Sequence, residues 1–194
     1  DPQVTRLVIM GPQGSGKGTQ AARVAEKLGI PAISTGDIFR ANIKGGTELG
    51  KLAASYTDKG ELVPDSVTNS MVRDRLAQPD AVDGILLDGY PRNAAQVSEL
   101  DAILADSGLA LDAVIELVVP RDALLERLAK RAATEGRADD TEEAIERRLA
   151  VYAEQTAPLA QAYSDRGIRI EINGFGDLDE ITDSIIDGIA RYTN

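Results

Sequence analysis

Near its start the chain carries a run of residues, Gly11-Pro-Gln-Gly-Ser-Gly-Lys17-Gly-Thr19, whose types and spacing suit phosphate binding. The run follows an apolar stretch, Thr5–Met10, and precedes a helical pattern at Lys17–Leu28, which is the context that the G-x-x-x-x-G-K pattern requires. Its glycines allow positive φ, so successive backbone N–H groups can curl around phosphate oxygens. The helix N-terminus adds partial positive charge, and Lys17 can reach the β- and γ-phosphates. A glycine-rich turn with an exposed lysine is the simpler alternative, but it leaves the agreement of strand, motif and helix unexplained.

Two residue types are missing altogether, because the chain contains no Cys and no His. This excludes a disulfide framework, a Cys-rich zinc site, a thiol nucleophile, Ser–His catalysis and a phosphohistidine intermediate. Lysine, arginine, carboxylates, hydroxyls and the backbone remain. Phosphoryl transfer runs well on such groups, because it needs positioning and charge stabilisation more than covalent chemistry.

Length and composition suit one domain, 1–194, with an aliphatic core, since 43% of the 194 residues are hydrophobic and only 4% aromatic. The net charge of −11 argues against partners such as nucleic acid or an anionic membrane. No stretch approaches the roughly 18 apolar residues of a membrane span, and the N-terminus lacks a signal-peptide layout. We therefore expect a cytoplasmic protein, and we expect it to be a monomer.

The elements that position the phosphate-binding run alternate between strands and helices. Strands are predicted at Thr5–Met10, Ala32–Ser34, Gly84–Asp88, Ala113–Val119 and Ile168–Ile172. Helices are predicted at Lys17–Leu28, Asp37–Lys44, Glu48–Lys59, Asp65–Leu76, Ala94–Ala105, Arg121–Ala133, Thr141–Ser164 and Leu178–Tyr192. This alternation predicts an α/β fold, a doubly wound five-stranded parallel sheet with flanking helices and with ligands at the carboxyl ends of the strands. The short helices inserted between two strands over 37–63 either form a subdomain that clamps a substrate or have no role in function.

One departure from the generic phosphate-loop pattern points to a family. Position 18 is Gly where Ser or Thr would usually hold Mg²⁺, and the run 16–20, Gly-Lys-Gly-Thr-Gln, resembles the variant carried by adenylate kinases and their relatives. The resemblance extends over essentially the whole chain, through the segments STGDIFR at 34–40, GELV at 60–63, DGYPR at 88–92 (with Tyr for the family's Phe), GRADD at 136–140 and RRL at 147–149. It implies a P-loop nucleoside monophosphate kinase that reversibly transfers the terminal phosphoryl group of MgATP to AMP, giving two ADP.

The resemblance also implies roles for individual residues. The residues implied to bind ATP are Gly14, Ser15, Gly16, Lys17, Gly18, Thr19, Arg127, Arg131 and Gly176. Those implied to bind AMP are Thr35, Arg40, Glu61, Leu62, Val63, Gly89, Tyr90, Pro91, Arg92, Gln96, Arg137 and Arg148. Those implied to stabilise the transferring phosphoryl group are Lys17, Arg92, Arg131, Arg137 and Arg148, and Asp88 would hold Mg²⁺ through water. Taken alone, Thr35 could simply cap a helix and Arg92 could be a surface arginine.

The arginines supply the local positive charge that an anionic substrate demands of an acidic chain. Arg127 and Arg131 lie four apart on one predicted helix and share a face. Arg148 is predicted to fall on the apolar, inward stripe of the long helix with Leu149 and Tyr152, where a charge is unusual unless it meets a partner. A snorkelling arginine is the alternative.

The segment between Arg131 and Arg137 is only Ala-Ala-Thr-Glu-Gly. Long-type bacterial adenylate kinases carry a sizeable lid there, often with a Cys-bound zinc. This chain resembles the short-lid type without zinc, with a lid at about 130–140 and a nucleoside-monophosphate-binding region at about 34–63.

The identity of the acceptor base depends on Gln96, whose amide carries a carbonyl and an NH₂ that match the N1 and N6 positions of adenine. A solvated glutamine on an exposed helix face is the alternative. A UMP/CMP kinase of the same fold remains possible, although such relatives typically carry Asn at this position. A regulatory P-loop NTPase would need an Asp-x-x-Gly after its second strand and an Asn-Lys-x-Asp, and the chain has neither.

Overall fold

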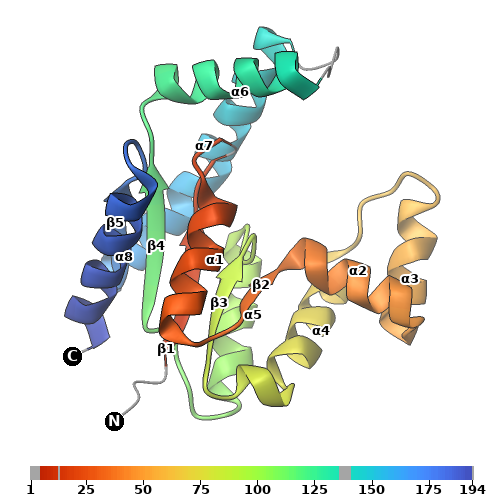
Figure 1. The fold of residues 1–194 in the computed structure, drawn as a ribbon. Helices are drawn as coiled ribbons and strands as arrows, with labels where there is room; N and C mark the ends of the chain where they lie inside the picture. The colour runs from red at the N-terminus through yellow and green to blue at the C-terminus, as the bar shows by residue number, and fades with distance from the viewer. Residues whose placement is uncertain (1–4, 13, 136–140, 194) are drawn as a thin grey trace.

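The computed structural model describes residues 5–12, 14–135 and 141–193. At its centre is a sheet of five strands in the order β2-β3-β1-β4-β5, all paired in parallel (Figure 1). The strands are β1 (Thr5–Met10), β2 (Ala32–Ser34), β3 (Gly84–Asp88), β4 (Ala113–Val118) and β5 (Arg169–Asn173). The predicted doubly wound parallel sheet is therefore confirmed.

Helices connect successive strands. They are α1 (Lys17–Leu28), α2 (Thr35–Gly45), α3 (Glu48–Thr57), α4 (Asp65–Leu76), α5 (Ala94–Ala105), α6 (Arg121–Glu135), α7 (Glu142–Asp165) and α8 (Leu178–Thr193), with a short 3₁₀ turn at Pro79–Ala81. The start of α2 lies earlier than predicted because Ser34 caps it, its Oγ accepting a hydrogen bond from the Asp37 backbone N–H at 3.1 Å. The alternative that Thr35 is the cap is therefore wrong, and its hydroxyl is left for another use.

The strands β1, β3 and β4 are buried on both faces, which is why they read as nearly continuous apolar runs, whereas the edge strand β5 alternates buried and more exposed residues. Along β1, Leu7 and Ile9 face one layer while Val8 and Met10 face the other. The first layer is made by α1 and α8, which pack over β1, β4 and β5. Its buried members are Leu7, Ile9, Ala21, Val24, Ala25, Leu86, Ala113, Ile115, Leu117, Ile170, Ile172, Ile181, Ile185 and Ile189.

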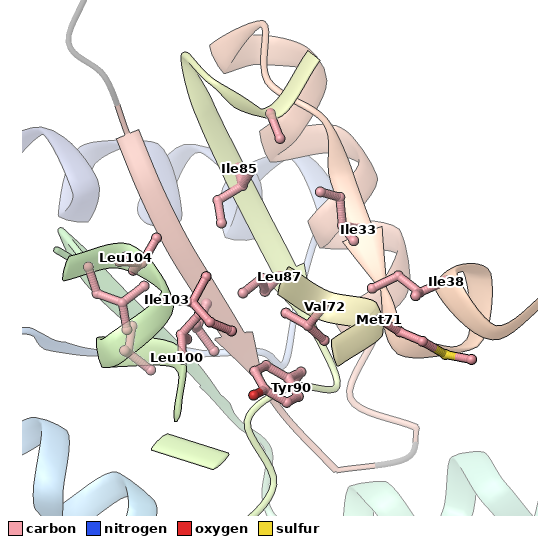
Figure 2. Close-up of a cluster of buried hydrophobic side chains, with 14 of the residues drawn as sticks. Ile33, Ile38, Met71, Val72, Ile85, Leu87, Tyr90, Leu100, Ile103 and Leu104 are labelled. Carbon is pink, nitrogen blue, oxygen red and sulfur yellow. The ribbon is translucent and has the colours of Figure 1, made fainter. Parts of the chain in front are cut away.

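The second layer contains side chains from α2, α4, α5 and α7, packed against β1, β2 and β3 (Figure 2). Tyr90, directly after β3, lies in this layer and is 1% exposed, and its hydroxyl donates to Asn69 Oδ1 at 2.8 Å. Each large apolar side chain that is fully buried here contributes about 1.5–3 kcal/mol. The layer therefore fixes the segment after β3, which carries several predicted site residues.

Two pairs of helices extend from the carboxyl edge of the sheet, α2 with α3 on one side and α6 with the start of α7 on the other (Figure 1). A small cluster that includes Leu124, Leu128 and Leu149 joins α6 to α7. At the other pair, α3 packs so closely on α2 that a Cβ at Gly50 would lie 2.2 Å from the Asn42 carbonyl oxygen.

A search of the described helices found none with the length and apolar character needed to cross a membrane.

Candidate active site

The predicted phosphate loop joins β1 to α1 at the carboxyl edge of the sheet. Gly14 and Gly16 adopt left-handed φ values of 84° and 82°. Gly11 does not adopt a positive φ. It is required for space instead, since a Cβ there would lie 2.7 Å from Ser15 Oγ. Gly16 caps α1 without a side-chain hydrogen bond, so the N–H groups of the first turn are available to an anion.

Lys17 lies against the end of β3. Its Nζ is 2.7 Å from Asp88 Oδ1, and the two side chains are 28% and 18% exposed. The contact follows from strand register, because β3 is the neighbour of β1 and places Asp88 beside Ile9. The sequence did not predict this ion pair. Lys17, implied to hold phosphate, and Asp88, implied to hold Mg²⁺ through water, are therefore in contact with each other.

A cavity of about 880 Å³ opens over this loop. Its wall includes a large share of the predicted site, drawn from the phosphate loop, the turn after β3, α6 and α7. The predicted residues that line it are Gly14, Gly16, Lys17, Gly18, Thr19, Gly89, Tyr90, Pro91, Arg92, Arg127, Arg131 and Arg148. The basic side chains concentrated here oppose the negative charge of the rest of the chain, as an anionic ligand requires.

A second cavity of about 620 Å³ adjoins the first, and Gly89 and Arg92 line both. The predicted residues that line it also include Thr35, Leu62, Val63 and Gln96. Gly89 has a φ of 87°, and a Cβ there would lie 3.1 Å from Thr35 Oγ1, so glycine lets α2 approach this turn. The Arg92 side chain is oriented by its Nε, which donates to the Gly89 carbonyl at 2.8 Å.

Gln96 is 5% exposed, so the alternative of a solvated glutamine on an open helix face is wrong. Its Oε1 accepts from the Arg92 backbone N–H at 2.7 Å, and its Nε2 donates to Asp65 Oδ1 at 3.0 Å. Asn93 caps the same helix by accepting from the Gln96 N–H. The amide is thus part of the wall of the second cavity with a fixed orientation.

Arg127 is held in place by two contacts. One guanidinium nitrogen donates to the Gly14 carbonyl at 3.0 Å, and its Cζ lies 5.6 Å from the centroid of the Phe175 ring. Phe175, 55% exposed, is a residue that the sequence analysis missed. The available signal was the segment Asn173–Gly176, from which only Gly176 was predicted to be a site residue.

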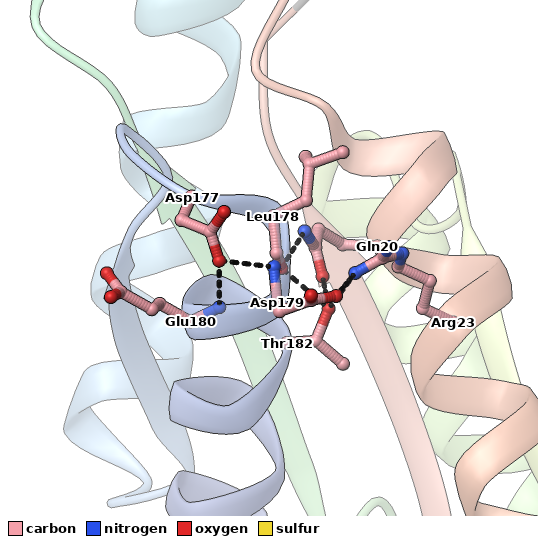
Figure 3. A network of polar contacts seen from close by, with 7 residues as sticks. All are labelled: Gln20, Arg23, Asp177, Leu178, Asp179, Glu180 and Thr182. Carbon is pink, nitrogen blue, oxygen red and sulfur yellow. Dashed lines mark hydrogen bonds and ion pairs between the residues drawn. The ribbon is translucent and has the colours of Figure 1, made fainter.

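The start of α8, just after the loop that carries Phe175, is fixed to the phosphate-loop helix by a network of polar contacts (Figure 3). Gln20 of α1 is 1% exposed, accepts from Thr182 Oγ1 at 2.6 Å and donates to the Leu178 carbonyl at 3.2 Å. Nearby, Arg23 pairs with Asp179 at 2.8 Å. Gln20 closes the Gly-Lys-Gly-Thr-Gln run, and this network shows what its side chain does.

The structure places some predicted residues outside the two cavities. Arg40 is paired with Asp37 on its own helix at 2.5 Å, and this hydrogen bond lowers the pKa of the Asp37 carboxyl. Glu61 and Gly176 are exposed and Ser15 is buried within the loop. Arg137 lies outside the described residues, as does the rest of the predicted lid from 136 to 140.

Arg148 is exposed rather than on an inward stripe, so that prediction was wrong, although the side chain still borders the first cavity. Its neighbour in sequence, Leu149, takes the buried position against α6. An apolar stripe on a helix has an edge, and a long charged side chain at that edge reaches solvent and cavity together.

Helix α7 supplies more of the wall than was predicted. Tyr152, Gln155, Thr156 and Leu159 line the first cavity with the i, i+3, i+4, i+7 spacing of a single helical face. Burial raises the pKa of the Tyr152 hydroxyl to about 12. The spacing was visible in the sequence, but nothing indicated that this face met a ligand rather than the core.

A glycine-rich phosphate loop at the carboxyl edge of a doubly wound parallel sheet, with a second cavity sharing its wall, defines a P-loop protein of the nucleotide kinase class. Residues 9–168 match the family model described as adenylate kinase. The chain is 63% identical over 181 residues to an adenylate kinase from Bifidobacterium longum, covering 93% of this chain and 97% of the relative. It is 58% identical over 188 residues to one from Kocuria rhizophila (97% and 100% covered) and 58% identical over 177 residues to one from Thermobifida fusca (91% and 94% covered). The chain belongs to the adenylate kinase family and is a phosphotransferase.

Proposed function

We propose that the protein transfers the terminal phosphoryl group of MgATP to AMP, reversibly, with the first cavity as the donor site and the second as the acceptor site. Membership of the family supports the reaction itself. The observation that carries the assignment of sites is the shared wall. Gly89 and Arg92 border both cavities, so two nucleotides bound there would meet with their phosphates at Arg92.

On the donor side, the N–H groups that open α1 and the Lys17 ammonium are placed to hold the β- and γ-phosphates. Lys17 would exchange its contact with Asp88 for phosphate. Asp88 and the Thr19 hydroxyl offer the oxygen groups that suit the magnesium of MgATP, directly or through water. Arg127 would stack on the adenine, because a planar guanidinium packs well on a ring face.

On the acceptor side, Arg92 would bind the AMP phosphate while Thr35, Gln96 and the 61–63 segment surround the base. Arg40 would join Arg92 by giving up Asp37, since its side chain is 73% exposed and free to turn. Gln96 and Thr35 lie in the wall of the same cavity, which supports their proposed role in recognising adenine.

In the transfer step, an oxygen of the AMP phosphate attacks the γ-phosphorus and the bond from that phosphorus to the β,γ-bridging oxygen breaks. The electron pair leaves with ADP, and the acceptor becomes the second ADP. The attacking oxygen is already ionised, so the step needs no general base, in agreement with a chain that has no His. Lys17, Arg92, Arg131, Arg137 and Arg148 would spread the charge of the transition state, and contacts of this kind can be worth about 10³–10⁵ in rate.

The region at about 34–63 and the short lid at about 130–140 would close over the substrates and exclude water, which otherwise hydrolyses ATP. The separation of the helix pair α2 and α3 from the pair α6 and α7 at the sheet edge supports such closure (Figure 1). All the residues in this scheme come from one chain, which supports a monomer. The substrates are cytoplasmic metabolites, and the net charge of −11 disfavours nucleic-acid and membrane partners.

The experiment is an assay of ADP formed from MgATP with AMP, UMP or CMP as acceptor, in the parent protein and in Gln96→Leu. AMP should be preferred over UMP by up to about 10⁴-fold in kcat/KM, because a site built around one hydrogen-bonding edge rejects analogues that leave its groups unpaired. Gln96→Leu should lose most of that preference. Equal use of UMP or CMP by the parent would refute the assignment of the acceptor.

A further inference from the structure

We infer that Asp65 makes the acceptor site specific for adenine over bases of reversed hydrogen-bonding polarity, by locking the orientation of the Gln96 amide. The inference rests on the proposed function, in which Gln96 meets the acceptor base. It adds a positioning residue that neither the sequence pattern nor the family match assigns.

The lock consists of two partners of opposite kind. The Arg92 backbone N–H can only donate, and it donates to Gln96 Oε1 at 2.7 Å. The Asp65 carboxylate can only accept, and its Oδ1 accepts from Gln96 Nε2 at 3.0 Å. A turn of the amide by half a rotation would set NH₂ against N–H and a carbonyl oxygen against a carboxylate. Gln96 is 5% exposed and its hydrogen bond to Asp65 is partly buried, so water reaches that contact only from the side of the exposed Asp65.

Asp65 is itself held from a second direction. Its Oδ2 accepts from Asn93 Nδ2 at 3.1 Å, and Asn93 Oδ1 accepts from the Gln96 backbone N–H at 2.8 Å. The three side chains therefore form a closed ring of hydrogen bonds in which every donor and acceptor is assigned. The ring joins the N-terminus of α4 to that of α5, and all three residues line the acceptor cavity.

After these two hydrogen bonds, the oxygen and the nitrogen of the Gln96 amide can each make one more. Oε1 keeps a second lone pair and Nε2 a second hydrogen. Adenine fits this pair, because its N6 amino group donates and its N1 accepts. Hypoxanthine presents an O6 acceptor beside an N1–H donor, which would require the amide to turn over. The uracil edge has the same reversed order. A freely turning glutamine would accept both kinds of base, so Gln96 alone does not explain selectivity, whereas Gln96 held by Asp65 together with the Arg92 N–H does.

The test compares AMP with IMP, which differ only at this edge of the base. The parent should favour AMP by about 10³-fold or more in kcat/KM. In Asp65→Asn the new side chain can donate as well as accept, so the turned amide is opposed by the Arg92 N–H alone instead of by both partners. We expect the AMP-to-IMP ratio to fall about tenfold or more, through faster use of IMP, with the KM for ATP unchanged. Asp65→Ser, whose hydroxyl also donates or accepts, gives the same test if the Asn variant folds poorly.

Asp101→Asn is the matched control. It makes the same change of charge on α5, where Asp101 pairs with Arg166, away from both cavities. Its AMP-to-IMP ratio should equal that of the parent. An unchanged ratio in folded Asp65→Asn or Asp65→Ser would overturn the inference. If Gln96→Leu left the ratio unchanged as well, the proposed role of Gln96 would fail with it, whereas loss of the ratio in Gln96→Leu alone would refute only the lock.

Discussion

The contact between Lys17 and Asp88 gives one substitution two separable effects, on turnover and on stability. Lys17→Met removes a preorganised positive charge from the proposed phosphate site, and loss of one such group costs about 2.7–4 kcal/mol of transition-state stabilisation. Turnover should therefore fall by about 10²–10³-fold. Stability should change as well, because the structure places the ammonium 2.7 Å from a carboxylate that is only 18% exposed.

Methionine would leave the Asp88 carboxylate without that partner in a mostly buried position. An unpaired group of this kind costs about 1–3 kcal/mol. At about 2–4 °C of melting temperature per kcal/mol for a chain of this size, we expect Lys17→Met to melt several degrees below the parent. The double variant Lys17→Met with Asp88→Asn removes the unpaired charge, so it should recover stability but not activity.

The assays are steady-state ADP formation and thermal unfolding followed by circular dichroism. The combination expected is low turnover in both variants with reduced stability only in the single one. Turnover within tenfold of the parent in Lys17→Met would refute the assignment of this lysine to phosphate. A single variant as stable as the parent would show that the ion pair contributes nothing to the fold.

Three further predictions concern other parts of the molecule. Phe175→Leu should raise the KM for ATP about two- to fivefold and leave the KM for AMP unchanged, because it removes a cation–π contact with Arg127 worth about 0.5–1 kcal/mol. Phe175→Tyr should restore the KM for ATP. Equal changes in both KM values would contradict this role. Burial raises the pKa of Tyr152 to about 12, so stability should hold below pH 10 and fall as the pH rises from 10 to 12, by up to roughly 3 kcal/mol for this group. Tyr152→Phe should lessen that fall in melting temperature. Elemental analysis of the dialysed protein should find no stoichiometric zinc, and one zinc per chain would contradict the short-lid interpretation.

The fold was predictable because each strand is a short apolar run that ends at a turn residue. β3, for example, is GILLD, with its four residues before the aspartate buried. The positions of caps were less predictable, since Ser34 and Thr35 are chemically similar and only the structure shows which one accepts from Asp37 N–H. The order of the strands in the sheet depends on contacts between distant segments, and no local pattern encodes it.

The candidate site was predictable where a motif dictates backbone shape, as in the phosphate loop, and where residues follow one strand, as Asp88 and Arg92 follow β3. It was not predictable where a contact joins distant segments. Asp65 and Gln96 lie 31 positions apart, and Arg127 and Phe175 belong to different elements. For Arg148 the helical period gave the correct direction of the side chain around the axis of α7. The period does not give how deeply a side chain is buried in the wall of the cavity.

The network around Gln20 involves both a sequence motif and contacts between distant segments. The Gly-Lys-Gly-Thr-Gln run was read for its phosphate-binding backbone, yet its last side chain is buried at the junction of α1 and α8 (Figure 3). Gln20 holds the start of α8, and the loop just before that helix carries Phe175, which contacts Arg127, which in turn donates to Gly14 of the phosphate loop. The chain of contacts thus returns to the loop from which it began. Gln20 therefore helps to position the proposed adenine-binding part of the donor site relative to the phosphate-binding part. Its side chain does this by packing between α1 and α8 and not by binding phosphate.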